Sequence, residues 1–175
     1  ILMYNLLLGD IMSNRKIQMP REVYIDPGII KDTADICKSL HLDKKILIVT
    51  GAHTFDVGAK PVIESLEKED IEYDVIKVNN ASQESISEVE ELITPDTTVL
   101  GVGGGKVIDV AKVSSFNKGV YFVSMPTTAS HDGIVSPMAS IKNPNTSISV
   151  NAHSPIAVIA DSEVIAQSPF RLLSA

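Results

Sequence analysis

The sequence predicts an α/β fold with a parallel sheet that helices cover on both faces. Short β-branched runs alternate along the chain with segments whose apolar residues recur at helical spacing. The apolar runs do not alternate with polar residues, as expected for strands buried on both sides. The chain has 175 residues, of which 44% are hydrophobic and 21% charged, which suffices for one ordinary domain with its own core.

The expected elements follow one another at the pitch of βαβ units, and a hairpin interrupts the series near the end. In chain order they are a helix over 26–40, a strand over 45–51, a helix over 59–70, a strand over 73–78, a helix over 85–93, a strand over 97–103, a helix over 106–116, a strand over 119–126, a hairpin over 138–150 and a strand over 155–160.

Local signals predict where several elements begin and end. Pro61 suits the first turn of a helix, and Pro126 stops a strand. Ser85 and Glu88 have the spacing of a capping box, and Asp161 or Ser162 resembles the cap of a last helix.

Helical spacing also predicts which residues of two helices face the core. In the first helix these residues are Ile30, Ala34 and Cys37, and in the helix over 85–93 they are Ile86, Val89, Leu92 and Ile93.

The composition excludes several classes of function. A net charge of −7, scattered lysines and arginines, and the absence of Trp argue against nucleic-acid binding. The one cysteine, Cys37, rules out an internal disulfide and fits a reducing compartment, so we expect a cytoplasmic protein. No apolar run reaches the length of a membrane span. A signal peptide has its positive charges before the apolar run, whereas Arg15 and Lys16 come after it here.

Three glycines, Gly103–Gly105, end the strand predicted over 97–103. They match neither the dinucleotide fingerprint nor the P-loop. Residues without a Cβ nevertheless let backbone amides approach a phosphate, and the helix that follows offers its positive end. A carboxylate would repel a pyrophosphate, so we expect Asp109 to hold loop amides or a sugar hydroxyl. The alternative is a tight turn that binds no ligand.

A second polar stretch, SMPTTASHDG over 124–133, follows the next predicted strand and should open on the same edge of the sheet. It combines four hydroxyls with the imidazole of His131 and the carboxylate of Asp132, and Asp132-Gly133 predicts a turn. Hydroxyls suit phosphate or ribose, and a carboxylate can accept a hydrogen bond from a substrate hydroxyl. The alternative is a polar loop without a ligand.

The other histidines show no metal-binding spacing. His41 lies where a helix is expected to end. His53 follows the strand over 45–51 and could line a cofactor cleft, although we favour a solvated loop position.

Two stretches, GGGKVIDVAK and FVSMPTTASHDGIVSPMASI, together resemble the archaeal sn-glycerol-1-phosphate dehydrogenases. That family belongs with glycerol dehydrogenases, iron-containing alcohol dehydrogenases and dehydroquinate synthases. The wider group shares GGGK…D and PTT. The segment ASHDGIVSPMASI separates the glycerol-1-phosphate dehydrogenases from the rest of the group, because glycerol dehydrogenases tend to have Thr where His131 stands. The resemblance runs from Pro20 to the end of the chain.

The resemblance implies a Rossmann-like cofactor domain and assigns its site residues. Asp132 would bind the substrate hydroxyl and serve as the catalytic residue of this chain. The residues implied to contact NAD or NADP are Gly103, Gly104, Gly105, Lys106, Val107, Ile108, Asp109, Thr127, Thr128, Ala129, Ser130 and Ser136. Those from Thr127 to Ser130 would lie around the nicotinamide half.

The implied reaction is reversible hydride transfer between NAD(P)H and dihydroxyacetone phosphate, which gives sn-glycerol 1-phosphate for archaeal membrane phospholipids. The family's zinc ligands, an aspartate and two histidines, would all lie beyond Ala175, the histidines in an all-helical domain absent from this chain. We therefore expect no metal site here, no catalysis by this part alone, and a homo-oligomer when the protein is complete.

The expected organisation has an N-terminal extension or first edge strand over 1–19, an NAD(P)-binding domain over 20–161, and the start of a connection to the helical domain over 162–175. Two other functions stay open: a glycerol dehydrogenase-like polyol oxidoreductase, and a nucleotide-binding module without catalysis. The preference between NAD and NADP also stays open, because no Arg or Lys fork follows the first two predicted strands.

Overall fold

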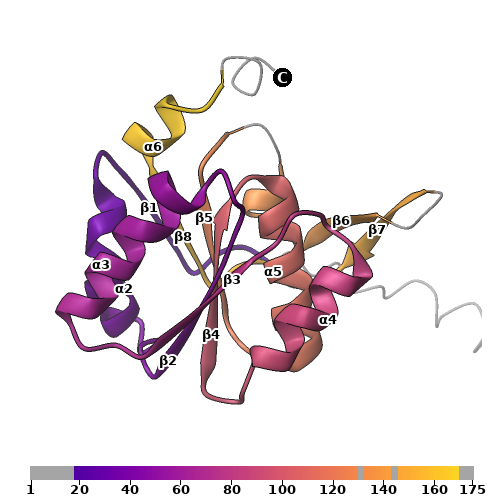
Figure 1. Cartoon of the computed structure of the whole chain (residues 1–175), viewed down its shortest axis with the longest axis horizontal. Helices are drawn as coiled ribbons and strands as arrows, with labels where there is room; N and C mark the ends of the chain where they lie inside the picture. The colour runs from indigo at the N-terminus through magenta and orange to yellow at the C-terminus, as the bar shows by residue number, and fades with distance from the viewer. Residues whose placement is uncertain (1–17, 130–131, 143–145, 170–175) are drawn as a thin grey trace, which may run out of the picture.

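The structure is a computed structural model that describes residues 18–129, 132–142 and 146–169, and of Asp132 only the backbone. Ser130, His131 and residues 1–17 of the expected N-terminal extension over 1–19 lie outside the described residues. Six parallel strands form one sheet, with helices on both of its faces (Figure 1). This is the Rossmann-like α/β fold predicted from the sequence.

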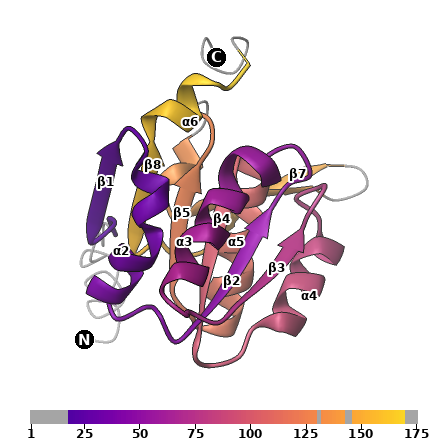
Figure 2. The ribbon, with the colours of Figure 1, turned by 60° about the vertical axis from the view of Figure 1, so that its left-hand side comes forward.

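The order of the strands across the sheet is β1-β8-β5-β4-β2-β3 (Figure 2). Their bounds are β1 Glu22–Asp26, β2 Lys45–Thr50, β3 Tyr73–Lys77, β4 Thr97–Gly103, β5 Phe122–Pro126 and β8 Ala157–Asp161. The separate antiparallel hairpin, also predicted, pairs β6 Met138–Lys142 with β7 Ser147–Asn151.

Short helical turns and longer helices connect these strands. They are η1 Ile29–Asp32, α2 Thr33–Ser39, η2 Phe55–Ala59, α3 Lys60–Lys68, α4 Gln83–Leu92, α5 Gly105–Lys118, η3 Asp132–Ile134 and α6 Ser162–Ala166. Along the described residues, no helix is long and apolar enough to cross a bilayer.

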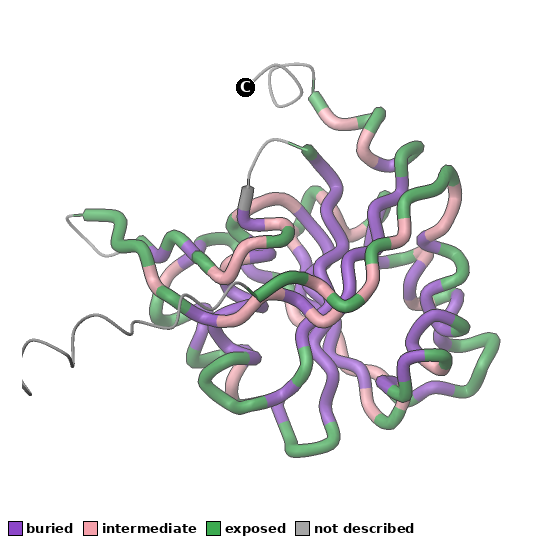
Figure 3. Tube along the Cα trace, turned by 180° about the vertical axis from the view of Figure 1, so that it is seen from behind, coloured by how far each residue is buried: buried purple, intermediate pink, exposed green. Residues whose placement is uncertain are grey.

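Alternation along the central strands divides the core into two clusters, because successive side chains of a strand point to opposite faces. In β2, Ile46 and Ile48 pack with α2 and α3, whereas Leu47 and Val49 pack with α4 and α5. The strands at the centre of the molecule are buried along most of their length (Figure 3).

The first helix faces the core as predicted, but it begins as a 3₁₀ turn. Gly28 precedes η1 with a φ of 74°, and Ile30, Ala34 and Cys37 are buried. His41 follows α2 with a φ of 59°, the left-handed position that commonly ends a helix.

The predicted cap of the helix over 85–93 was wrong by three residues. Ser82 is the cap of α4, and its hydroxyl accepts a hydrogen bond from the Ser85 amide at 3.4 Å. Ser85 therefore lies inside the first turn, and Glu88 makes no capping box. Leu92 was expected on the buried face but is 38% exposed.

Asp161 joins the beginning and the end of the described chain. One of its carboxylate oxygens accepts hydrogen bonds from the Glu163 and Val164 amides and so caps α6. The same buried carboxylate accepts from the amides of Gly28 and Ile30, at 3.2 Å each. The start of η1 and the start of α6 are thereby held at the carboxyl end of β8.

Candidate functional site

The predicted polar stretches meet at the carboxyl edge of the sheet. Gly103 ends β4, and its carbonyl accepts a hydrogen bond from the Thr127 amide, which follows β5, at 3.0 Å. On the other side of β4, the Thr50 hydroxyl at the end of β2 donates to the Val102 carbonyl at 2.9 Å. Hydrogen bonds therefore fix the ends of three neighbouring strands relative to one another.

Gly103 is needed for packing. A Cβ on this residue would lie 2.8 Å from the Cβ of Val107, closer than real side chains approach. The lack of a side chain lets the first turn of α5 fold back tightly against the end of β4.

Gly104 has a different setting, because it caps α5 with extended backbone at φ −83° and ψ −176°. The nearest atom to a Cβ on Gly104 would be Thr128 Cγ2 at 3.4 Å, an ordinary contact distance. Ser82 and Asp161 cap α4 and α6 with side-chain oxygens, whereas α5 has no side-chain cap. The first amides of a helix have no partner within the helix, so those of α5 suit an anion.

A pocket of about 560 Å³ opens beside Gly104, and we call it the glycine-loop pocket. It is lined by His53, Thr54, Val57, Gly104, Thr127, Thr128, Val164, Gln167, Ser168 and Pro169. This volume is in the range typical of small-molecule sites. His53 is exposed in a turn, as expected for a solvated loop position, and it also lines the pocket.

A second pocket, of about 480 Å³, lies on the other side of the loop, and we call it the hairpin pocket. It is lined by Ala81, Gly105, Lys106, Asp109, Gly133, Met138, Ala139, Ser140, Lys142, Ser147 and Ser149. The two pockets meet the same loop, one at Gly104 and the other at Gly105. An extended ligand with a charged centre could therefore occupy both.

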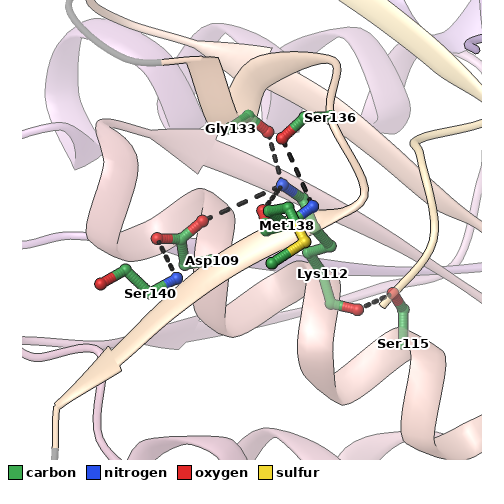
Figure 4. A network of polar contacts seen from close by, with 7 residues as sticks. All are labelled: Asp109, Lys112, Ser115, Gly133, Ser136, Met138 and Ser140. Carbon is green, nitrogen blue, oxygen red and sulfur yellow. Dashed lines mark hydrogen bonds and ion pairs between the residues drawn. The ribbon is translucent and has the colours of Figure 1, made fainter. Parts of the chain in front are cut away.

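Asp109 and Lys112 connect α5 to the segment that follows Asp132 (Figure 4). An oxygen of Asp109 accepts a hydrogen bond from the Ser140 amide at 3.1 Å, so this carboxylate does hold a backbone amide. Lys112 is fully buried, and its Nζ donates to the carbonyls of Gly133 at 2.6 Å and Met138 at 2.7 Å.

The structure brings some of the predicted site residues together and leaves others apart. Gly104, Thr127 and Thr128 line one pocket, and Gly105, Lys106 and Asp109 line the other. Ala129 is exposed and Ser130 lies outside the described residues.

The remaining residues predicted to contact the cofactor interact with other parts of this chain. Val107 and Ile108 are buried against the sheet, with exposed fractions of 6% and 0%, and their amides donate hydrogen bonds to the Gly104 carbonyl at 3.0 and 3.1 Å. The hydroxyl of Ser136 accepts a hydrogen bond from the Met138 amide at 3.3 Å.

Several residues of the site were missed in the sequence. Gln167 and Ser168 follow α6 and line the glycine-loop pocket, and the Ser168 hydroxyl is buried without a partner among the described residues. Sequence spacing gave no signal for these residues, because they reach the pocket only through the placement of β8 beside β5.

A third pocket, of about 620 Å³, lies at the opposite edge of the sheet and includes Phe116, Tyr121 and His153. The His153 ring meets Phe116 edge-on, with 5.6 Å between the ring centroids, and its Nε2 lies 3.4 Å from the Ser115 hydroxyl. Burial, together with the nearby Lys112 charge, lowers the pKa of His153.

The structure gives no donor set for a metal ion. Over 18–129, 132–142 and 146–169, no three His, Cys, Asp or Glu residues gather as metal ligands would. The described residues therefore do not fit the zinc ion that the resemblance implies, and no step is assigned to it. Cys37 is also unsuited to binding a metal, since burial raises the pKa of its thiol to about 12.

Comparison with known proteins gives one family and a set of curated relatives. The sequence profile of the iron-containing alcohol dehydrogenases matches residues 24–169. A glycerol-1-phosphate dehydrogenase (NAD(P)+) of Methanobrevibacter smithii is 68% identical over 164 residues, which cover 94% of this chain and 47% of the relative. The protein of the same name from Methanothermobacter thermautotrophicus is 49% identical over 163 residues, covering 93% and 47%. The chain thus spans about half the length of these relatives.

Solved structures share the fold at low sequence identity. A glycerol dehydrogenase from Schizosaccharomyces pombe superposes with a TM-score of 0.79 at 22% identity, over 91% of this chain and 41% of that one. A probable glycerol dehydrogenase from Sinorhizobium meliloti gives a TM-score of 0.78 at 24% identity, over 90% and 43%. At these identities the likeness concerns the architecture alone.

Proposed function

This chain belongs to the iron-containing alcohol dehydrogenase family, and from that premise we propose that it is the cofactor-binding part of a glycerol-1-phosphate dehydrogenase. The complete protein would reversibly reduce dihydroxyacetone phosphate to sn-glycerol 1-phosphate with NADH or NADPH. The names of curated relatives at 68% and 49% identity support this substrate over glycerol itself. The likeness to glycerol dehydrogenases rests on structures at 22% and 24% identity and does not favour a polyol substrate.

The observation that carries the proposal is the start of α5 between two pockets. The helix has no side-chain cap, and Gly104 leaves its first amides open to a ligand on the side of the glycine-loop pocket. A dinucleotide has two halves joined by a charged pyrophosphate. The pyrophosphate would bind the amides at Gly104–Lys106, because helix N-termini favour anions. The two halves would then extend into the glycine-loop pocket and the hairpin pocket.

The other residues of this chain would orient the cofactor and the substrate. Thr127 and Thr128 line the glycine-loop pocket together with Gly104 and would contact the cofactor there. Asp109 would position the hairpin through the Ser140 amide, while its negative charge lies one turn beyond the anion site. The Asp132 carboxylate would accept a hydrogen bond from the substrate hydroxyl and so hold the carbonyl carbon in place for hydride transfer.

When bound, NADH or NADPH would supply a hydride for the carbonyl carbon of dihydroxyacetone phosphate and become NAD+ or NADP+, and a proton from solvent would complete the new hydroxyl. The family's zinc would depend on residues outside this chain. We also propose that the complete protein works in the cytoplasm as a homo-oligomer. Residues of a single chain line both pockets.

The test uses the full-length gene product that contains this chain. Loss of NADH or NADPH absorbance on adding dihydroxyacetone phosphate would measure the forward reaction. The configuration of the product would be checked with an enzyme specific for sn-glycerol 3-phosphate, which should leave the product unconsumed. Oxidation of glycerol with NAD+ and no reduction of dihydroxyacetone phosphate would identify a polyol dehydrogenase instead. Cofactor binding without turnover of either substrate would favour the nucleotide-binding module.

A further inference from the structure

Lys112 is among the largest fully buried side chains of the described residues, in spite of its charge. Burying an ammonium group is costly unless polar groups surround it. Here the Gly133 and Met138 carbonyls accept hydrogen bonds from Nζ, and an oxygen of Asp109 lies 3.9 Å away. These contacts come from α5 and from the segment over 133–138.

The same contacts fix the path of that segment. Asp109 and Lys112 lie three residues apart, on neighbouring turns of one helix face. Between them they hold the Gly133 carbonyl, the Met138 carbonyl and the Ser140 amide (Figure 4). Three backbone positions between η3 and the middle of β6 are therefore attached to α5.

One helix, α5, is consequently attached both to the loop proposed to bind the cofactor and to the segment proposed to bind the substrate. α5 begins at Gly105, in the glycine loop, and Lys112 lies two turns further along it. Gly133, which accepts the shorter of the two hydrogen bonds from Lys112, is directly bonded to Asp132. A change at Lys112 would therefore shift the backbone of Asp132 relative to the loop that is proposed to hold the cofactor.

We propose that Lys112 is a positioning residue, whose buried ammonium places the Asp132–Gly133 backbone at the correct distance from the cofactor loop. This inference rests on the proposed function, because it assigns Lys112 a part in binding the substrate of that same site. As a positioning residue, Lys112 would act through Asp132 and not by contact with the substrate or the cofactor.

The test is a double-mutant cycle in the full-length protein. Lys112→Met keeps an unbranched stem of similar length and removes the ammonium group. Asp132→Asn removes the carboxylate charge, and the double variant combines the two changes. Ser115→Ala is the matched control, because Ser115 is also buried on α5 and its hydroxyl donates to the Lys112 carbonyl, not to the Asp132 segment.

We expect Lys112→Met to lower kcat/KM for dihydroxyacetone phosphate by roughly 100-fold, the effect of misplacing a group by about 1 Å. The Kd for NADH should change less than about threefold, since the glycine loop is not altered. The double variant should lose no more kcat/KM than Asp132→Asn alone, because Lys112 would act through that carboxylate. Ser115→Ala should retain the kinetics of the unmodified protein.

Other outcomes separate this inference from the proposed function. A full-length protein without activity on dihydroxyacetone phosphate would refute the function and the inference with it. An active protein in which Lys112→Met keeps its kcat/KM would refute the inference alone, as would losses that multiply in the double variant or a parallel loss of NADH affinity. An active protein in which Asp132→Asn is unimpaired would also refute the inference and leave the reaction standing.

A fall in melting temperature is expected for Lys112→Met, because two carbonyls lose a buried donor. If this variant does not fold, Lys112→Gln retains an N–H donor for one carbonyl and replaces it in the same cycle. The same criteria of kcat/KM, NADH affinity and non-additivity then decide the inference.

Discussion

A Cβ on Gly103 would lie 2.8 Å from the Cβ of Val107, whereas one on Gly104 would meet nothing closer than Thr128 Cγ2 at 3.4 Å. The two adjacent glycines of this loop therefore have different structural roles. The first lets α5 pack against the end of β4, and the second keeps space open beside the glycine-loop pocket. Substitutions at the two positions should separate stability from cofactor affinity.

Gly103→Ala should destabilise the protein. Overfilling a packed position typically costs about 1–3 kcal/mol of the free energy of unfolding. Chemical denaturation of the full-length protein measures this cost. Unchanged stability would show that α5 can shift away from β4 without loss.

Gly104→Val should leave the protein folded and reduce NADH affinity by at least about tenfold, since a branched side chain would occupy the place of a phosphate oxygen. Loss of a favourable cap residue costs the helix about 1 kcal/mol at most. Fluorescence titration with NADH measures the affinity, and Gly104→Ala gives an intermediate variant. Equal affinity in Gly104→Val and the unmodified protein would rule out the phosphate role of the loop.

Asp132→Asn in the full-length protein should lower turnover of dihydroxyacetone phosphate by about 100-fold or more, because an amide replaces the charged acceptor for the substrate hydroxyl. NADH affinity should be mostly kept. Steady-state kinetics and NADH titration on the same preparation test both parts. A matching loss of NADH affinity would assign Asp132 a structural role.

The lowered pKa of His153 predicts a stability that depends on pH. The folded state binds a proton here less readily than the unfolded chain, whose pKa is near 6.5. The contribution of the neutral His153 ring to the free energy of unfolding is therefore fully present above about pH 7. It declines as the pH falls below about 6.5. His153→Gln should show a shallower decline of melting temperature between about pH 7 and pH 5. Parallel curves for the two proteins would contradict the expectation.

Cys37 should react with thiol reagents only after unfolding. Its side chain is 1% exposed, and burial raises the pKa of the thiol to about 12, so little thiolate forms at neutral pH. The rate of modification should rise with denaturant along the unfolding transition. Rapid modification under native conditions would show local opening of α2, and Cys37→Ala provides the unlabelled control.

The alternating pattern of the sequence predicted the sheet, the hairpin and the glycine loop, because buried strands and amphipathic helices have strong local signals. β1 was not recognised as a strand, since EVYID is short, ends before Pro27 and exposes Val23 and Ile25. Its place beside β8 depends on pairing between distant segments, which no local window contains.

The approach of Gly104 and Thr127 to one pocket was predictable, because both residues follow the ends of neighbouring parallel strands. Lys112 could not be foreseen, because a lysine in a helical pattern normally faces solvent. The carbonyls that surround it come from Gly133 and Met138, which are brought there only by the fold. The cap of α4 was misplaced because two serines three residues apart give equivalent local signals.

β8 lies between β1 and β5, and among the described strands β1 pairs with β8 alone. During synthesis on the ribosome, the segment over 22–26 therefore emerges long before the strand that completes its hydrogen bonds. Pairing across so long a stretch of chain is slow, and an unpaired strand is prone to associate with other chains. Among the described strands, the first to be made is thus the one that stays without a hydrogen-bonded neighbour until residues 157–161 have emerged.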